Sequence, residues 1–155
     1  MKERGKSNMK TLVIAEHNSK NVSAATLSVI DAAKKLGRDI DLLVANNSCS
    51  NVLEEAKSIE GVSTVLDFSH EKFTNEIAED VAACAVSVKD DYDFFLASSS
   101  TSGKNNLPRI AALLDIQQIS EVTEIIDEKT FKRAYICWIL YCHCSILTRK
   151  KCSYN

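Results

Sequence analysis

The chain has little glycine, proline or aromatic side chain: 4 Gly, 1 Pro and 6% aromatic residues in a total of 155. This scarcity excludes collagen-like, proline-rich and low-complexity disordered proteins. Charge of one sign is also not in excess, because 19 basic and 21 acidic residues give a net charge of -2. A basic surface is the usual mark of nucleic-acid binding, so we expect no nucleic-acid partner. No apolar run approaches the roughly 20 residues of a membrane-spanning helix, so we expect no membrane insertion.

The composition that is present is that of one ordinary globular domain, with 45% hydrophobic and 26% charged residues. The first residues are polar and contain no apolar segment of the kind found in secretory signals. We therefore predict that residues 1–8 are a disordered extension and that Met9 opens the domain. A protein of this kind is expected to be cytoplasmic, or to lie in the mitochondrial matrix if eukaryotic, with its thiols reduced.

Short apolar runs alternate with longer stretches of helical periodicity. This alternation is typical of α/β proteins, and runs without polar alternation indicate strands that are covered on both faces. We predict a three-layer Rossmann-like domain with a mainly parallel sheet flanked by helices. The predicted strands cover residues 12–15, 40–44, 62–68, 92–97 and, with less regular spacing, 119–126. The predicted helices begin near residues 24, 52, 73 and 107.

Two helices carry clear local signals. Ser23 is the candidate N-cap of the first helix, and Gly37 lies just past its end. The helix predicted over 73–89 shows apolar residues spaced four, four, three and four apart, which indicates one buried face. Its members are Phe73, Ile77, Val81, Cys84 and Val88. Cys84 is thus expected to be a small core residue rather than a reactive thiol.

A loop rich in Ser and Thr, residues 98–105, follows the fourth predicted strand and ends in Gly103, Lys104 and Asn105. A phosphate-binding loop would need Gly where Ser98 stands and Ser or Thr where Asn105 stands. The favoured interpretation is structural: Gly103 allows a tight turn, Asn106 caps the next helix, and Pro108 lies in its first turn. The alternative is a small protein that binds adenine nucleotides through Ser98–Asn105.

Four stretches resemble the alpha subunit of the electron transfer flavoprotein family, in order and at matching intervals. The first three are Lys-Thr-Leu-Val-Ile-Ala-Glu-His at 10–17, Ala-Ala-Lys-Lys-Leu-Gly at 32–37 and Leu-Val-Ala at 43–45. The most specific is Ser-Gly-Lys-Asn-Asn-Leu-Pro-Arg-Ile-Ala-Ala-Leu-Leu-Asp at 102–115, continued by Gln-Ile-Ser-Glu-Val at 118–122. The resemblance covers residues 9–134, the family's amino-terminal domain.

The resemblance implies an electron carrier rather than an enzyme. In the family this domain packs against a beta subunit, and a carboxy-terminal domain, expected to be absent here, holds most of the FAD site. The intact heterodimer carries electrons from acyl-CoA and related dehydrogenases to a membrane quinone reductase. We therefore expect FAD in the intact heterodimer and none on this chain alone, no catalytic, cofactor-binding or metal residues, and impaired electron transfer. The structural or interface residues are expected to be Gly103, Lys104, Asn105, Pro108 and Arg109.

Other polar residues could suggest chemistry but have ordinary structural interpretations. Glu16 and His17 follow the first strand, and a capping or interface role is favoured over acid/base catalysis. Asp90, Asp91 and Asp93 form a short acidic cluster that is read as a solvated turn rather than a cation site. Cys49 lies near the start of a helix, where it is taken as a plain helix residue.

The cysteines are unevenly placed, since four of the six fall in residues 137–155. A zinc site would need paired ligands around tight turns, and the spacing Cys-x4-Cys-His-Cys-x7-Cys does not provide them. Codons for the residues from Tyr135, read one base later, allow Ile-Tyr-Ala-Gly-x-x-Ile-Ala-Thr-Val-Gln, similar to what the family carries there. We interpret residues 135–155 as a non-family tail produced by a reading-frame shift near Ala134. We predict that residues 135–147 are poorly anchored and aggregation-prone.

Overall fold

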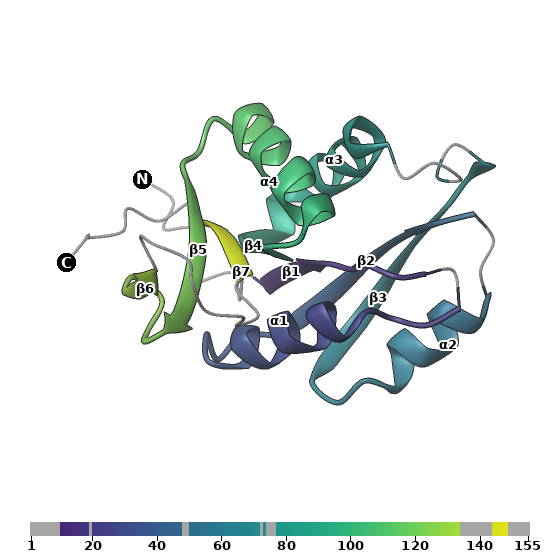
Figure 1. Ribbon diagram of the computed structural model, residues 1–155, viewed down its shortest axis with the longest axis horizontal. Coiled ribbons are helices and arrows are strands. Elements are labelled where there is room, and N and C mark those ends of the chain that lie inside the picture. Colours follow the sequence, from purple (N-terminus) through teal and green to yellow (C-terminus); the bar gives the residue numbers. More distant parts are fainter. Residues whose placement is uncertain are drawn as a thin grey trace, which may run out of the picture.

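The computed structural model describes residues 10–18, 20–47, 50–71, 73, 77–133 and 144–148, which form one seven-stranded sheet between two layers of helices (Figure 1). The strand order is β3-β2-β1-β4-β7-β5-β6. The strands are β1 Lys10–Ile14, β2 Ile40–Asn46, β3 Val62–Ser69, β4 Tyr92–Ser98, β5 Gln118–Ile125, β6 Phe131–Arg133 and β7 Cys144–Thr148. The main helices are α1 Ala24–Lys34, α2 Ser50–Ser58, α3 Ala78–Ser87 and α4 Thr101–Leu114, and a short 3-10 turn, η2, covers Lys89–Asp91. The predicted three-layer α/β class is confirmed.

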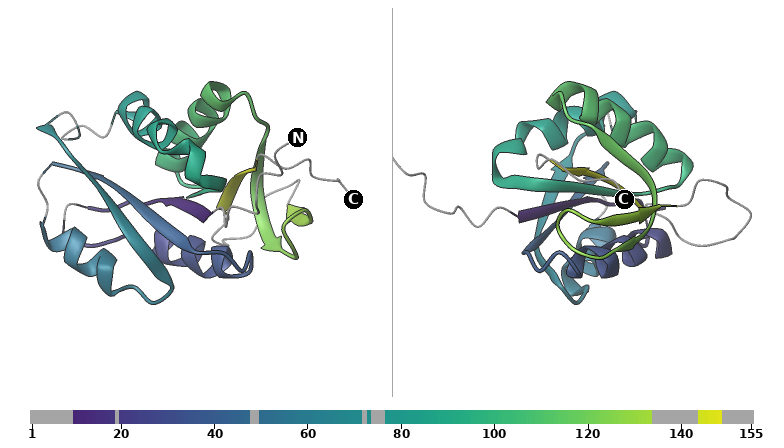
Figure 2. Two further views of the ribbon diagram at one scale, coloured as in Figure 1. Left: turned by 180° about the vertical axis from the view of Figure 1, so that it is seen from behind. Right: turned by 90° about the vertical axis from the view of Figure 1, so that its left-hand side faces the viewer.

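Four strands, β3, β2, β1 and β4, pair in parallel and form the part of the sheet that we call the parallel half. Every residue of β2 and of β4 is buried, as expected for strands covered by helices on both faces. One face packs on α1 and α2 through residues such as Val13, Leu42 and Phe94. The other face packs on α3 and α4 through Leu12 and Phe95. The right-hand view of Figure 2 shows these two helical layers on either side of the sheet.

The remaining strands, β7, β5 and β6, pair antiparallel and form the antiparallel half. The whole sheet is therefore mixed, and the expected mainly parallel pairing holds for the parallel half alone. The strand predicted at residues 119–126 is β5, whereas β6 and β7 were not predicted.

The strand β7 corrects the prediction of a poorly anchored tail for residues 144–147. It lies between β4 and β5, and both Ile146 and Leu147 are fully buried. The physical reason is that two adjacent apolar side chains in a strand point to opposite faces, so each contributes to one of the two cores. Residues 134–143, which include Cys137 and Cys142, lie outside the described residues.

The local helix signals are confirmed in part. Ser23 caps α1, because its Oγ accepts from the N–H of Ala25 at 3.2 Å, and Gly37 has φ +62° just past the helix. The helix predicted over 73–89 is shorter, and Ile77 is not on the buried face, since it precedes the first turn of α3 and is 45% exposed. The alanines of α3 fill its place against the sheet, as Ala78, Ala82 and Ala85 are all buried.

Candidate functional site

The candidate site lies where β1 and β4 end side by side, because the connections from the sheet leave in opposite directions at these two strands. In open α/β sheets, ligands bind outside the carboxyl ends of the strands at this switch point. Glu16 follows β1 directly, and the segment Ser98–Ser100 joins β4 to α4. The sequence therefore brings a carboxylate and a helix N-terminus together at the position where a phosphate would be expected.

The carboxylate of Glu16 is held by three donors at this position. Its Oε1 accepts from the hydroxyl of Ser98 at 2.7 Å, from the peptide N–H of Gly103 at 3.1 Å and from the hydroxyl of Ser100. A helix N-terminus favours negative charge because its first N–H groups have no partner within the helix. Glu16 thus acts as the anion at the start of α4.

The backbone of Glu16 is held just as firmly from the other helical layer. Its N–H donates to Oγ1 of Thr26 at 2.9 Å, and its carbonyl accepts from the N–H of Ser23 at 2.8 Å. Glu16 therefore connects the N-termini of α1 and α4 across the end of the sheet. The predicted capping role for Glu16 is confirmed, although the capped helix lies 87 positions away in the sequence.

Gly103 is needed for a close approach rather than for a turn. It lies inside α4, and a Cβ added to it would come within 1.9 Å of the carbonyl oxygen of Ser98. The predicted tight turn at Gly103 and cap at Asn106 are therefore wrong, because α4 begins at Thr101 with Ser100 as its N-cap. Pro108 accordingly lies in the interior of α4 and not in its first turn. The hydroxyl-rich sequence provides its own cap earlier than the Asn, which is why the helix starts sooner.

The other residues of the predicted structural or interface set lie along α4. Lys104 and Asn105 are exposed, and so is Pro108. Lys104 pairs with Glu121 of β5 at 2.7 Å, and Arg109 pairs with Glu79 of α3 at 2.9 Å. The exposed residues of α4 form a surface that we call the α4 outer face: Thr101, Lys104, Asn105, Pro108, Ala112 and Leu113. Leu113 is its one large aliphatic residue and is 61% exposed.

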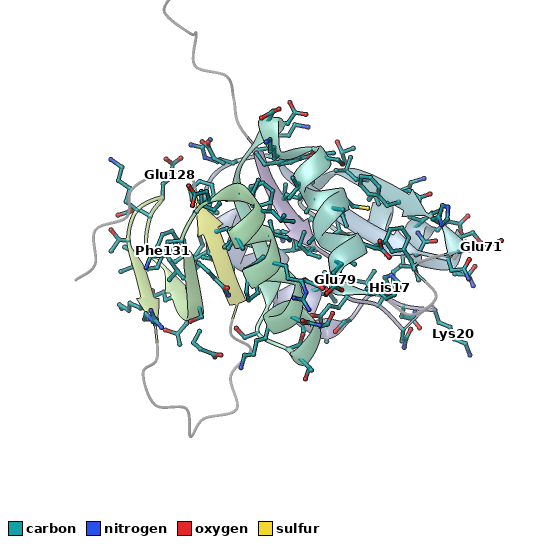
Figure 3. All side chains as sticks on the ribbon, turned by 90° about the horizontal axis from the view of Figure 1, so that it is seen from above. His17, Lys20, Glu71, Glu79, Glu128 and Phe131 are labelled. Carbon is teal, nitrogen blue, oxygen red and sulfur yellow. The ribbon has the colours of Figure 1, made fainter. Side chains whose placement is uncertain are left out.

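Two residues considered as candidates for chemistry, His17 and Asp93, have structural partners instead. The Nε2 of His17 lies 2.9 Å from the carbonyl oxygen of Ala45, and Figure 3 shows His17 near Lys20, far from Glu128 and Phe131. The prediction of a solvated turn is wrong for Asp93, which is a buried residue of β4 and pairs with Arg38 at 3.3 Å, whereas Asp90 and Asp91 lie in η2. Within the described residues, no cluster of three or more His, Cys, Asp or Glu side chains could hold a metal ion. Over the same residues, no helix is both long and apolar enough to cross a membrane.

Cys49 and Cys84 are the two cysteines that precede residue 137. Cys84 is partly buried against the α3 and α4 core, and burial raises the pKa of its thiol. This placement agrees with a core residue, because a raised thiol pKa lowers the thiolate fraction. Cys49 lies outside the described residues.

One polar group was missed at the opposite end of the sheet. Asp41 is 1% exposed, and its Oδ2 accepts from Nζ of Lys10 and from the hydroxyl of Tyr92, both at 2.8 Å. Burial and the neighbouring Asp41 raise the pKa of Tyr92, and the hydrogen bond to Asp41 raises the pKa of Lys10. The available signal was a carboxylate inside the apolar run of residues 40–44, which requires a buried partner.

Comparison with known proteins gives a consistent result. The family model described as "Electron transfer flavoprotein domain" matches residues 11–136. The electron transfer flavoprotein subunit alpha of Pseudomonas aeruginosa is 46% identical over 125 residues, which cover 81% of this chain and 40% of the relative. The mitochondrial alpha subunit of Dictyostelium discoideum is 37% identical over 130 residues, covering 79% and 37%. That of Arabidopsis thaliana is 41% identical over 132 residues, covering 79% and 36%. The chain thus spans about two fifths of the length of these relatives.

Proposed function

Because this chain belongs to the electron transfer flavoprotein family, we propose that it supplies the amino-terminal α/β domain of an alpha-type electron-carrier subunit. In this role the domain is a scaffold that associates with a beta subunit, and it is not itself a substrate-transforming enzyme. The intact carrier would take electrons from acyl-CoA and related dehydrogenases and pass them to a membrane quinone reductase.

The observation that carries the scaffold role is the position of Glu16. Its carboxylate takes the Gly103 N–H and two hydroxyls at the N-terminus of α4, the position where a nucleotide phosphate would need those donors. A phosphate there would meet a negative charge in place of free N–H groups. This geometry disfavours the alternative of a nucleotide-binding protein that uses Ser98–Asn105.

The same geometry does not fit the pyrophosphate of FAD. The loop also lacks the glycines that let a backbone approach a pyrophosphate, since Gly103 is the one glycine between residues 98 and 105. We therefore propose that the FAD of the intact carrier is held by the part of the alpha subunit that lies outside the segment aligned with this chain.

The α4 outer face is the surface we propose for contact with the beta subunit. It carries the apolar Leu113 near the end of α4 and the polar Lys104 and Asn105 near its start, and interfaces commonly combine apolar and polar residues. Its helix is fixed at the start by Glu16 and at the side by the ion pair of Arg109 with Glu79. A rigid helix is well suited to present such a surface.

Copurification with an electron transfer flavoprotein beta subunit tests this proposal. We expect a one-to-one complex without flavin absorption, and no calorimetric heat from the free chain with AMP or ATP. Leu113→Asp should abolish the complex, because a charge would be buried at the contact. The matched control is Leu27→Asp on α1, a leucine that is 40% exposed on the opposite helical layer, which should leave the complex intact. Tight AMP binding, or equal loss in both variants, would contradict the proposal.

A further inference from the structure

The strand β7 is the last one that the structure describes, and it lies inside the sheet rather than at its edge. The strands β4 and β5 do not pair with each other, and β7 lies between them as an antiparallel partner of both. It pairs with β4 from Phe94 to Ser98 and with β5 at Gln118, Ile119 and Val122. We call the space between β4 and β5 the strand slot. A strand in this slot supplies backbone hydrogen bonds to both neighbours at once.

The two buried side chains of the strand that fills the slot are both aliphatic. Ile146 is fully buried in the core beneath α1, and Leu147 is fully buried in the core beneath α4. They lie opposite Leu96 and Phe95 of β4, respectively. An adjacent pair of aliphatic residues therefore satisfies both faces, and backbone pairing supplies the rest, as when a peptide adds a strand to a sheet.

The strand β5 is adjusted to the slot by a local distortion. The pairing of β5 with β7 shifts register between Ile119 and Val122, and Glu121 within this shift has φ +56°. Its carboxylate pairs with Lys104 of α4 at 2.7 Å. A positive φ is unfavourable for a residue other than glycine, so such a conformation is held by its surroundings. The distortion of β5 beside the slot is therefore held in part by a contact with α4.

The connection between β6 and β7 is long enough for β7 to reach beyond the slot of its own molecule. Residues 134–143 are ten in number, and ten residues can extend over roughly 33 Å. The crossing from β6 past β5 to the slot needs two strand spacings, about 10 Å. The connection can therefore reach a slot on a neighbouring molecule.

From these observations we infer that the strand slot also accepts the Cys144–Thr148 segment of a second copy of this chain, giving a strand-exchanged dimer. Every contact of β7 is the same in the exchanged form, so the two forms differ mainly in the entropy of association. Because the strand is joined covalently to its own sheet by only ten residues, its effective concentration at its own slot is in the millimolar range. Exchange is thus suppressed at low protein concentration and becomes populated near that range. This inference does not depend on the proposed function.

Refolding of the full chain at two concentrations tests the inference under reducing conditions. After denaturation, refolding at about 10 μM should give monomer, and refolding at about 2 mM should give a discrete dimer that survives dilution, seen by size exclusion with light scattering. The dimer should be absent from the variant Ile146→Asp/Leu147→Asp. Monomer at both concentrations overturns the inference, as does a ladder of larger species that forms equally in the variant.

A second experiment keeps the inference testable from the side of the slot. A synthetic peptide of residues 144–150, with Ser in place of Cys144, is added to the full-length double variant. We expect a saturable rise in Tm of several degrees, because a ligand of the folded state stabilises it. The same peptide with Asp at both aliphatic positions should give none. If the variant is folded and the native peptide produces no shift, the inference is wrong; if the variant is unfolded, the refolding experiment decides.

Discussion

The two halves of the sheet are built on different principles. In the parallel half, β2 and β4 are buried along their full length, and each strand is joined to the next by a helix that covers it. In the antiparallel half, β5 buries only Ile119, Val122 and Ile125, and β6 has three residues, none of them buried. The difference shows that β2, β1 and β4, at the centre of the parallel half, are stabilised by their own apolar residues, whereas the antiparallel half depends on a few contacts with its neighbours.

Those contacts join the halves at three places. The buried pair of β7 reaches both cores, α4 lies over β4, β7 and β5, and Arg38 connects β4 to the β5–β6 turn. Substitutions in the parallel core should therefore lower the free energy of unfolding most, those at the joins less, and those at isolated polar groups least.

The largest effect is expected from Phe94→Ala in the parallel half. Phe94 is fully buried and carries Arg38 over its ring at 5.5 Å, so its removal leaves a cavity in the centre of the sheet. We expect a loss of about 3–5 kcal/mol in the free energy of unfolding, measured by urea denaturation. Phe131→Ala in β6 makes the same chemical change at a partly buried position and should cost about 1 kcal/mol. Equal losses would remove the distinction between the two halves.

The next effect is expected at the join formed by α4. Gly103→Ala would force a Cβ to within 1.9 Å of the Ser98 carbonyl oxygen, so α4 must move away from β4 and from Glu16. We expect a loss of about 2–3 kcal/mol in thermal or urea unfolding. Gly37→Ala separates this clash from backbone strain, because Gly37 has φ +62° but open space around it; it should cost about 1 kcal/mol. A Gly103→Ala variant as stable as the native chain would show that the close approach is not required.

The parallel half could be predicted from sequence because its signals are local. An unbroken apolar run, a serine before a helix and a glycine after it each act within a few residues, as at Ser23 and Gly37. The strand β7 could not be predicted in this way. Its two apolar residues stand among polar ones and gain a place only because β4 and β5 leave a slot between them. No periodicity within the segment records that slot.

The candidate site was predicted in composition but not in geometry. Glu16 was expected to cap, and Gly103 was expected to matter, yet nothing local shows that they meet across 87 positions. The start of α4 was missed because Ser100 and Asn106 are both good caps, and the choice depends on the tertiary contact with Glu16. The pairs of Lys104 with Glu121 and of Arg109 with Glu79 likewise depend on packing between elements.

A smaller effect is expected at Arg38, which joins the two halves by charge. Its guanidinium donates to Glu128 in the β5–β6 turn at 2.6 Å and pairs with the buried Asp93 of β4 at 3.3 Å. Arg38→Met keeps much of the aliphatic stem but removes both pairs, so we expect a loss of about 1.5–2 kcal/mol. Lys132→Met breaks the pair of Lys132 with Glu124, which is exposed on both sides, and should cost less than about 0.5 kcal/mol. Amide hydrogen exchange should show faster opening of the β5–β6 turn in Arg38→Met alone.

Apart from the control substitutions, the smallest effect at neutral pH is expected from Tyr92→Phe, which acts entirely within the parallel half. It removes the hydroxyl that donates to Asp41 and keeps the ring that packs edge-on against Phe95, with ring centroids 6.2 Å apart. Asp41 retains Lys10 as a partner, so the expected loss is about 1 kcal/mol at pH 7.

The pH dependence of the same variant gives the sharper measurement. Burial and Asp41 raise the pKa of Tyr92 in the folded state, whereas an unfolded tyrosine ionises near pH ~10. Above that pH the unfolded chain releases the proton that the folded chain keeps, so the stability of the native protein falls as pH rises, by up to ~1.4 kcal/mol per pH unit. Tyr92→Phe should therefore lose less stability than the native chain between pH 9 and 11. Lys10, whose pKa is also raised, contributes a fall of the same sign in both proteins, so the slope decreases without vanishing. Identical slopes in urea titrations would contradict this prediction, because the Tyr92 hydroxyl would then ionise as freely in the folded chain as in the unfolded one.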